Sequence, residues 1–494
     1  MNEESISKAF GWKLLERFGT QIAQFVLQLV LARLLDPEHY GALSIMIIFT
    51  TLATVFIQNG FNTALVQKKE VDDRDFSSVF WISTGIALIV YTILFFVAPF
   101  IAEFYEMPEI IKPFRVIGLV LFPGAFNSIQ LAIVRRKMDF KKVFLSNVAG
   151  ILVSGALGIT IAYMGGGLWA LVAQNITNVA VTCIVMLFTV RWVPKLIIDF
   201  KRTKSLLSFG WKFIVSGLIN SLYDNLRSLV VGKKYDTSTL GYYNRGKHFP
   251  ETLVSAISGT VQTVLLPAMA KKQDDIEQIK KFTRTSMVVS SYVLLPMMAG
   301  LAAISTPLIS LILTDKWLPC VPYLQIYCFI WAFNPIHSCN LQAINAIGRS
   351  DIYLKLEVVK KVVGIALIVI AVFCFDTPLA IALTGAITTI ISSFVNAFPN
   401  KKLIGYAYSE QIKDVLPSFL LAAFMGAAVY AINFLGINHI YKLLIQIFLG
   451  ITIYIVFSMV FKLKGFEFVR KTIKDFAKKG GKNPGQKNEG ENRA

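Results

Sequence analysis

The sequence predicts an all-α integral membrane protein. Of its 494 residues, 55% are hydrophobic and only 16% are charged, whereas a soluble globular protein carries about 25% charged residues. The mean hydropathy is +0.60. A water-soluble core cannot bury so much apolar surface, and a disordered chain would be far less apolar. The chain is therefore expected to form a polytopic bundle of helices.

The predicted helices are apolar windows separated by charged or Gly- and Pro-containing breaks. A helix needs about 20 apolar residues to cross a ~30 Å hydrocarbon core, and about 14 windows meet that length. A membrane β-barrel would instead show alternating segments of about 10 residues. Glu3 and Glu4 precede a full-length first span, so no cleavable signal peptide is expected. The windows are 12–35, 41–62, 78–101, 113–134, 144–164, 168–190, 208–231, 250–270, 285–313, 319–347, 356–375, 378–397, 415–435 and 441–461.

The distribution of basic residues predicts the orientation of these spans. If the amino terminus is cytoplasmic, most of the 49 Lys and Arg fall in inner segments, as the positive-inside rule requires. Both termini are then cytoplasmic. The net charge of +19 mostly restates this bias, so no nucleic-acid partner is expected. One outer segment is an exception, because four cations lie between the seventh and eighth spans: Lys233, Lys234, Arg245 and Lys247. They lie either close to lipid headgroups or in a vestibule that attracts an anion.

An internal repeat relates the two halves of the chain. The tetrapeptide Phe-Gly-Trp-Lys at 10–13 returns at 209–212, and Gly41 matches Gly241. Because six spans separate the copies, the repeats are parallel, which predicts two six-helix lobes around a central cavity. Two further spans follow the second repeat. The predicted organisation is an N-terminal lobe at 1–190, a cytoplasmic linker at 191–207, a C-terminal lobe at 208–400, two additional spans at 401–463, and a basic, disordered cytoplasmic tail at 464–494 that contacts lipid headgroups.

The sequence contains no recognisable enzyme motif. A phosphate-binding P-loop, a His-Glu-x-x-His helix and a Gly-x-Ser-x-Gly elbow are all absent from it. Its five cysteines include no Cys-x-x-Cys and are interpreted as packing residues. We therefore expect neither catalysis nor a cofactor or metal.

Polar side chains inside the spans give the positive signal. Ionisable groups are costly within a membrane and usually face a bundle interior or a water-filled cavity. Those of the first and seventh spans recur every three or four residues and so lie on one helix face. The stripes predict a wet, net-positive cavity that hydrates sugars and attracts a phosphate. Each residue also has a plain structural explanation: a lysine near a span end can snorkel, the pair Asp224 and Arg227 can neutralise each other, and a glutamine can join two helices.

Several motifs resemble those of one protein family. They are the segment 31–43, beginning Leu-Ala-Arg-Leu-Leu-Asp-Pro-Glu, the segments 60–68 and 76–81, Arg-Arg-Lys-Met-Asp-Phe at 135–140 and Gly-Tyr-Tyr-Asn-Arg at 241–245. These resemble the oligosaccharide flippases of bacterial surface-polysaccharide pathways, most closely the colanic-acid and teichuronic-acid exporter branch of the multidrug, oligosaccharidyl-lipid and polysaccharide exporter superfamily. The resemblance extends from about residue 7 to 406; the last two spans match no quoted motif.

The resemblance implies a flippase of the bacterial cytoplasmic membrane that moves an undecaprenyl-diphosphate-linked oligosaccharide by alternating access. Membrane lipids, a polysaccharide polymerase and other assembly proteins are its expected partners, with H⁺ or Na⁺ as coupling ion. Site residues are assigned from the stripes and not from the family. The diphosphate is assigned to Arg17, Lys212, Arg227 and Arg245, the sugars to Gln21, Gln24, Gln28, Gln58, Asn220, Gln262 and Asn334, and ion coupling to Asp224.

Three alternatives remain open. A cation-coupled multidrug antiporter of the same superfamily predicts an acidic or aromatic cavity, whereas these stripes are basic. A non-transporting scaffold of a polysaccharide-assembly complex would gain nothing from intramembrane cations. A membrane-embedded glycosyltransferase should have a large outer loop with catalytic carboxylates, and the predicted outer loops are short.

Overall fold

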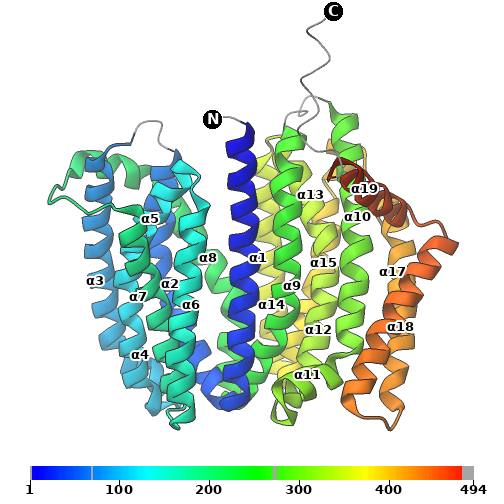
Figure 1. The fold of residues 1–494 in the computed structure, drawn as a ribbon, viewed down its shortest axis with the longest axis horizontal. Helices are drawn as coiled ribbons and strands as arrows, with labels where there is room; N and C mark the ends of the chain where they lie inside the picture. The colour runs from blue at the N-terminus through cyan, green and yellow to red at the C-terminus, as the bar shows by residue number, and fades with distance from the viewer. Residues whose placement is uncertain (1–2, 68–70, 271–274, 481–494) are drawn as a thin grey trace, which may run out of the picture. The chain divides into compact units, whose positions relative to one another are not determined.

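The computed structural model describes residues 3–67, 71–270 and 275–480, and over these ranges the regular elements are α-helices and short 3₁₀ helices (Figure 1). Nine helices of this described part are long and apolar enough to cross a membrane. The prediction of an all-helical, multi-pass membrane protein is confirmed. Contacts divide the chain into two compact units, and each is described by itself.

Unit 1 comprises the described residues of Met1–Gly246, Ile312–Cys320 and Asp376–Ile381. It contains more than the first repeat, because the helix that opens the second repeat also belongs to it. Its elements are α1 (Glu3–Leu34), α2 (Pro37–Gln67), α3 (Asp73–Phe104), η1 (Pro108–Ile110), α4 (Ile111–Ile117), η2 (Gly118–Val120), α5 (Leu121–Lys137), α6 (Phe140–Tyr163), α7 (Leu168–Val190), α8 (Phe200–Lys234), the beginning of α9 (Thr237–Ala270), and η3 (Asp315–Cys320).

Helix packing in unit 1 explains this division. The most extensive packing within this unit is between α6 and α7, between α1 and α6, and between α2 and α8. Because α8 lies along α2, it joins unit 1 although the repeat assigns it to the second half. Local signals fix individual ends: α3 begins at a capping box in which Asp72 and Asp75 each bind the other's backbone N–H, and Gly167, with φ +51, precedes α7.

Unit 2 comprises the described residues of Lys247–Leu311, Val321–Phe375 and Ala382–Ala494. Its long helix α10 contacts α12, α13 and α17. Beyond the end of α9, the elements are α10 (Ile276–Ala303), α11 (Ser305–Leu313), α12 (Val321–Ala332), α13 (Asn334–Ala346), α14 (Ser350–Cys374), α15 (Pro378–Ala397), α16 (Asn400–Leu403), α17 (Tyr408–Ala431), η4 (Ile432–Phe434), α18 (His439–Val460) and α19 (Lys464–Gly480).

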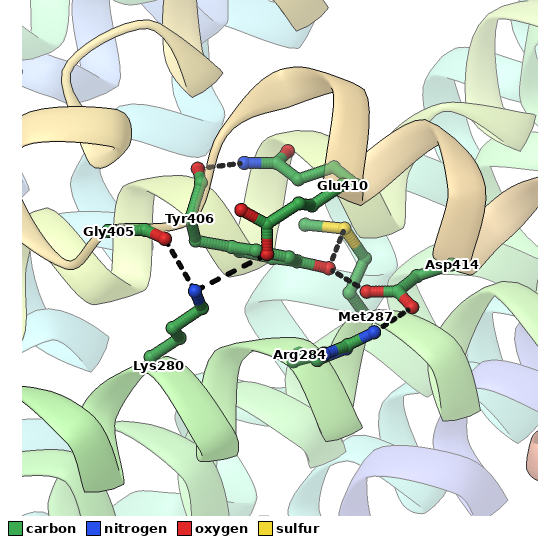
Figure 2. Close-up of polar contacts among 8 residues, drawn as sticks. Lys280, Arg284, Met287, Gly405, Tyr406, Glu410 and Asp414 are labelled. Atoms are coloured by element: carbon green, nitrogen blue, oxygen red, sulfur yellow. Dashed lines mark hydrogen bonds and ion pairs between the residues drawn. The ribbon is translucent and has the colours of Figure 1, made fainter.

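Polar contacts tie α17 to one end of α10 (Figure 2). Arg284 Nη2 lies 2.7 Å from Asp414 Oδ1, and the hydroxyl of Tyr406 donates to Asp414 Oδ2 at 2.8 Å. Lys280 Nζ lies 3.3 Å from Glu410 Oε2. Since the Asp414 side chain is only 6% exposed, its two partners replace the water that the carboxylate loses.

Asn433 of η4 makes a second tie, at the other end of α10. Its side-chain amide donates to the carbonyl oxygen of Ala303 at 2.9 Å. From α18, Lys442 Nζ donates to the Asn433 carbonyl oxygen at 3.1 Å, and Gln446 Nε2 donates to Asn433 Oδ1 at 3.0 Å. The last spans are therefore joined to α10 at both of its ends.

Several of the predicted spans are interrupted, and the window 285–313, for example, is divided between α10 and α11 at Ile304. The window 113–134 is split by η2, and the window 319–347 contains the end of η3, then α12 and α13, with a break at Phe333. These are the fourth spans of the two repeats. In the second, Pro335 occupies the first turn of α13, where a missing N–H costs little.

The segment 464–480, expected to be disordered, forms helix α19 instead. Phe466 and Val469 interrupt its basic sequence and pack against the core of unit 2. Gly465 permits this docking, because a Cβ there would lie 2.5 Å from Cβ of Tyr292 on α10. A few apolar residues at helical spacing thus order a segment whose overall composition is that of a tail.

Candidate functional site

The polar stripe of α1 lies on a helix that packs against α6. Arg17, Gln21, Gln24 and Gln28 are all half-buried. In the first half of α1, Trp12 contacts Phe144 of α6, and their ring centres are 6.0 Å apart.

Lys13 of the same stripe is satisfied locally. Its Nζ lies 2.6 Å from Glu16 Oε2 and 5.1 Å from the ring centre of Phe140. Lys13 therefore has a local partner on α1.

The stripe of α8 belongs to the same unit. Lys212, Asn220 and Asp224 are exposed on the surface of the chain, and Arg227 is half-buried with its guanidinium 5.9 Å from the ring centre of Tyr223. Three predicted diphosphate ligands, one on α1 and two on α8, therefore lie in unit 1. Within the part of the chain that the structure describes, these two helices do not reach the hydropathy of the nine apolar spans, and neither does α9. Helices of membrane length that carry cations and amides have to direct them to protein or water.

The remaining predicted sugar ligands are dispersed. Gln58 Nε2 donates to the carbonyl oxygen of Gly124 on α5, at a long 3.5 Å, so this residue joins two helices. Asn334 lies in unit 2 at the start of α13 and accepts from the Ser338 hydroxyl at 3.3 Å. The side chain of Gln262 lies outside the described set.

Arg245 occupies a different environment from the expected open vestibule. It is 6% exposed, and its guanidinium lies 4.4 Å from the ring centre of Tyr40 and 5.1 Å from that of Trp317. These two rings cover the cation, and its assignment to the diphosphate stays a prediction. Stacking between aromatic faces is a geometry that suits the planar guanidinium.

Trp317, which the sequence did not single out, is the centre of this cluster. It is 0% exposed, donates from Nε1 to the carbonyl oxygen of Ala32 at 2.8 Å, and meets the rings of Tyr40 and Tyr242 at 5.4 and 6.1 Å. Its position in a short break between spans, next to Asp315 and Lys316, gave no sign of burial. Only the tertiary structure brings it against the ends of α1, α2 and α9.

The beginnings of α2 and α9 cross next to this cluster at two repeat-related glycines. A Cβ at Gly41 would lie 1.9 Å from the carbonyl oxygen of Thr237, and one at Gly241 would lie 2.1 Å from that of Pro37. Pro37 and Thr237 are themselves related by the repeat. The crossing is therefore reciprocal, as expected for a contact on a pseudo-twofold axis.

Ion pairs surround the crossing. Lys316 Nζ lies 3.3 Å from Asp36 Oδ1, and Lys233 Nζ lies 2.9 Å from Glu106 Oε1. Lys234 Nζ lies 3.2 Å from Asp376 Oδ1, with the carboxylate 96% exposed. Thus two of the four outer cations noted in the sequence are neutralised here. Lys233 and Lys234 lie at the end of α8 and Lys316 lies in η3, and each pairs with a carboxylate in a connection between helices.

Tyr105, between α3 and η1, contacts α8. Its hydroxyl lies 3.5 Å from the carbonyl oxygen of Leu229 on α8. Burial raises the pKa of Tyr105 to about 12, so the phenol stays protonated and can only act as a neutral hydrogen-bonding group near neutral pH.

Unit 2 contains an apolar cavity of about 430 Å³ between α10, α17 and α18, with Leu253 of α9 at its edge. Gly300, Met425, Gly450 and Ile451 are among its lining residues. Such a lining suits a hydrocarbon chain and is unsuited to a phosphate or a sugar. Any polar headgroup therefore needs a different set of residues, and the stripes of α1 and α8 provide cations and amides.

The chain is similar to several known proteins over most of its length. The matching family model is described as "Polysaccharide biosynthesis protein" and covers residues 30–322. The lipopolysaccharide biosynthesis protein WzxC of Escherichia coli (strain K12) is 24% identical over 401 residues, 79% of this chain and 80% of WzxC. The teichuronic acid biosynthesis protein TuaB of Bacillus subtilis (strain 168) is 21% identical over 433 residues, 87% of this chain and 89% of TuaB. Among solved structures, the lipid II flippase MurJ in an inward closed conformation shares the fold, with a TM-score of 0.75 and 18% identity over 90% of this chain and 98% of MurJ.

Proposed function

Because the chain belongs to the polysaccharide biosynthesis protein family, we propose that it is a flippase for undecaprenyl-diphosphate-linked oligosaccharide repeat units. It moves them from the inner to the outer leaflet of a bacterial cytoplasmic membrane, for the assembly of a surface polysaccharide. In this proposal the chain crosses the membrane about 14 times with both termini in the cytoplasm, as two six-span lobes and two additional spans.

The observation that best supports this proposal is the presence of cations and amides on α1 and α8. Both have membrane-spanning length, yet they carry Arg17, Lys212 and Arg227 together with amide side chains. A lipid-linked diphosphate needs cations for its phosphates and hydrogen-bonding groups for its sugars. We assign the diphosphate to these three cations and the sugars to the glutamines of α1 and to Asn220. Asp224 is the proposed coupling residue for H⁺ or Na⁺.

Alternating access requires a contact that closes one side of the membrane and opens in the other state. We propose that the crossing at Gly41 and Gly241, with its surrounding ion pairs, is this closure on the extracytoplasmic side. Its reciprocal geometry supports the assignment, since two repeats that rock about a pseudo-twofold axis separate there symmetrically. Arg245, buried between Tyr40 and Trp317, then acts in the closure more than in attracting the substrate.

The test is a leaflet-translocation assay in proteoliposomes with a fluorescent undecaprenyl-diphosphate oligosaccharide. Arg17→Ala, Lys212→Ala and Arg227→Ala are compared with the parent and with Lys413→Ala, which removes an exposed cation from α17. Loss of translocation in the three variants, with the control active and all proteins folded, supports the function and its site.

The other outcomes separate the alternatives. Translocation that survives all three substitutions retains the flippase and discards the assigned cations. No translocation of any lipid-linked glycan, together with export of cationic dyes, would make the protein a multidrug antiporter. Neither activity, with binding to other polysaccharide-assembly proteins, would favour the scaffold.

A further inference from the structure

Helix α19 lies where a membrane surface has to be. Helix α18 has 22 residues, which at 1.5 Å per residue matches a ~30 Å hydrocarbon core. Only residues 461–463 separate its end from the beginning of α19. The first turn of α19 is therefore close to the point where the chain leaves the hydrocarbon core, and Figure 1 shows the helix crossing α10 obliquely.

One face of α19 is fixed to the protein. Phe466 and Val469 pack on the core of unit 2, and the rings of Phe466 and Tyr292 are 6.4 Å apart. Tyr292 is itself held by α18, because its hydroxyl bonds to the Ser458 hydroxyl at 3.1 Å and its carbonyl oxygen accepts from Tyr454 at 2.8 Å. The orientation of the opposite face is thereby fixed as well.

The opposite face is basic and exposed. Lys464, Arg470, Lys471 and Lys474 are all exposed, with the exposed Glu467 among them. Among the described residues, no acidic side chain forms an ion pair with any of the four, in contrast to Lys13, Lys233 and Lys316 elsewhere. Over the whole helix, six Lys or Arg stand against two Asp or Glu.

Phe468 adds an apolar contact to this basic face. Its side chain is 47% exposed, on the outward side of a helix whose other aromatic residue in this turn, Phe466, is packed inward. Cations flanking a protruding aromatic ring are the surface chemistry of helices that lie in the headgroup region of anionic bilayers.

We propose that α19 is an interfacial helix that binds anionic phospholipid headgroups, of the phosphatidylglycerol type, through Lys464, Arg470, Lys471 and Lys474, with Phe468 inserted at the boundary between headgroups and acyl chains. The interaction is independent of the transported substrate. It holds the end of α18 against α10 at the bilayer surface.

The experiment places a fluorophore on α19 of the full-length protein in nanodiscs. Cys374 is the exposed one of the five cysteines, and the other four are buried. In a Cys374→Ser background, Phe468→Cys is labelled with bimane, and its quenching is measured with brominated phosphatidylglycerol or brominated phosphatidylcholine at equal mole fraction and without substrate.

We expect quenching by the anionic lipid to exceed quenching by the zwitterionic lipid by at least about twofold at low salt, and the ratio to approach one at high ionic strength. The variant Arg470→Gln/Lys471→Gln/Lys474→Gln should lose the preference. The control Lys401→Gln/Lys402→Gln/Lys413→Gln removes the same charge from exposed positions elsewhere in unit 2 and should retain it.

Two results would overturn the proposal. Equal quenching by both lipids in the parent means that no anionic headgroup is selected, and quenching by neither means that α19 does not face the bilayer. A preference that survives the triple substitution on α19 would assign the selectivity to other residues. Thermal unfolding of each protein, which these exposed substitutions should leave unchanged, shows that the protein has remained folded.

Discussion

The Cβ that Gly41 lacks would lie 1.9 Å from the carbonyl oxygen of Thr237, and the repeat reproduces this relationship between Gly241 and Pro37. Two helices can approach so closely only where neither has a side chain. The clash would involve backbone atoms, which cannot rotate away as a side chain can. Close helix crossing at this point therefore depends on glycine at both positions.

Gly41→Ala should destabilise the protein by about 1–3 kcal/mol, the usual cost of overpacking a tight contact. Gly85→Ala is the matched control, because nothing lies within 4 Å of a Cβ there and alanine favours a helix. The thermal midpoints of the purified proteins in detergent give the comparison. If both alanines were tolerated equally, the crossing would not be a tight contact.

Trp317→Ala should cost about 3–5 kcal/mol, the range for removing a fully buried aromatic side chain. It also removes the hydrogen bond to Ala32 and one of the two rings that cover Arg245. Trp169→Ala, at a position that is 42% exposed, is the control. Equal thermal midpoints for the two variants would argue against burial of Trp317.

Each ion pair around the crossing should add little to the free energy that keeps the crossing closed, whereas the three pairs together should have a measurable effect. Exposed pairs are each worth about 0–1 kcal/mol. In Asp36→Asn/Glu106→Gln/Asp376→Asn, opening of the crossing should become roughly two- to tenfold more frequent. Cys320, which is buried beside Trp317, reports that opening through its rate of alkylation, read by peptide mass spectrometry. An unchanged rate would show that the pairs do not hold the crossing closed.

Tyr406→Phe should lower stability at neutral pH, since Asp414 loses a hydrogen-bond donor. Burial raises the pKa of Tyr406 above its usual value of 10. The folded protein thus favours the protonated phenol, whose contribution is complete below pH 10 and declines as the pH rises through and above 10. The difference in unfolding midpoint between parent and variant should consequently narrow as the pH rises from 10 upward. A constant difference would mean that the phenol titrates normally.

The family and the general architecture could be predicted from the sequence because both depend on local patterns of residues. The motif at 31–43 pointed to the family that the comparisons confirm, and apolar windows locate helices without tertiary information. Breaks in the fourth span of each repeat were missed, since neither Gly118 nor Phe333 differs from residues inside unbroken helices.

The surroundings of single side chains could not be predicted in the same way. Arg245 is buried by Trp317, a residue far away in the sequence, so no local pattern indicated it. The positions of charged residues within the predicted spans did indicate which helices carry cations. The assignment of Arg17, Lys212 and Arg227 to a diphosphate remains a prediction. The helix at 464–480 was missed because its lysines dominate the composition, while two apolar residues decide its packing.

The contacts of α10 have a mechanical consequence. Ion pairs at Arg284, hydrogen bonds at Tyr292 and the amide of Asn433 attach α17 and α18 to the two ends and the middle of α10. Helices fastened at three levels can neither slide nor pivot against one another without breaking several contacts at once. A movement of α10 would therefore carry α17 and α18 with it as one block, so that the last spans enlarge the part of the protein that moves with this helix.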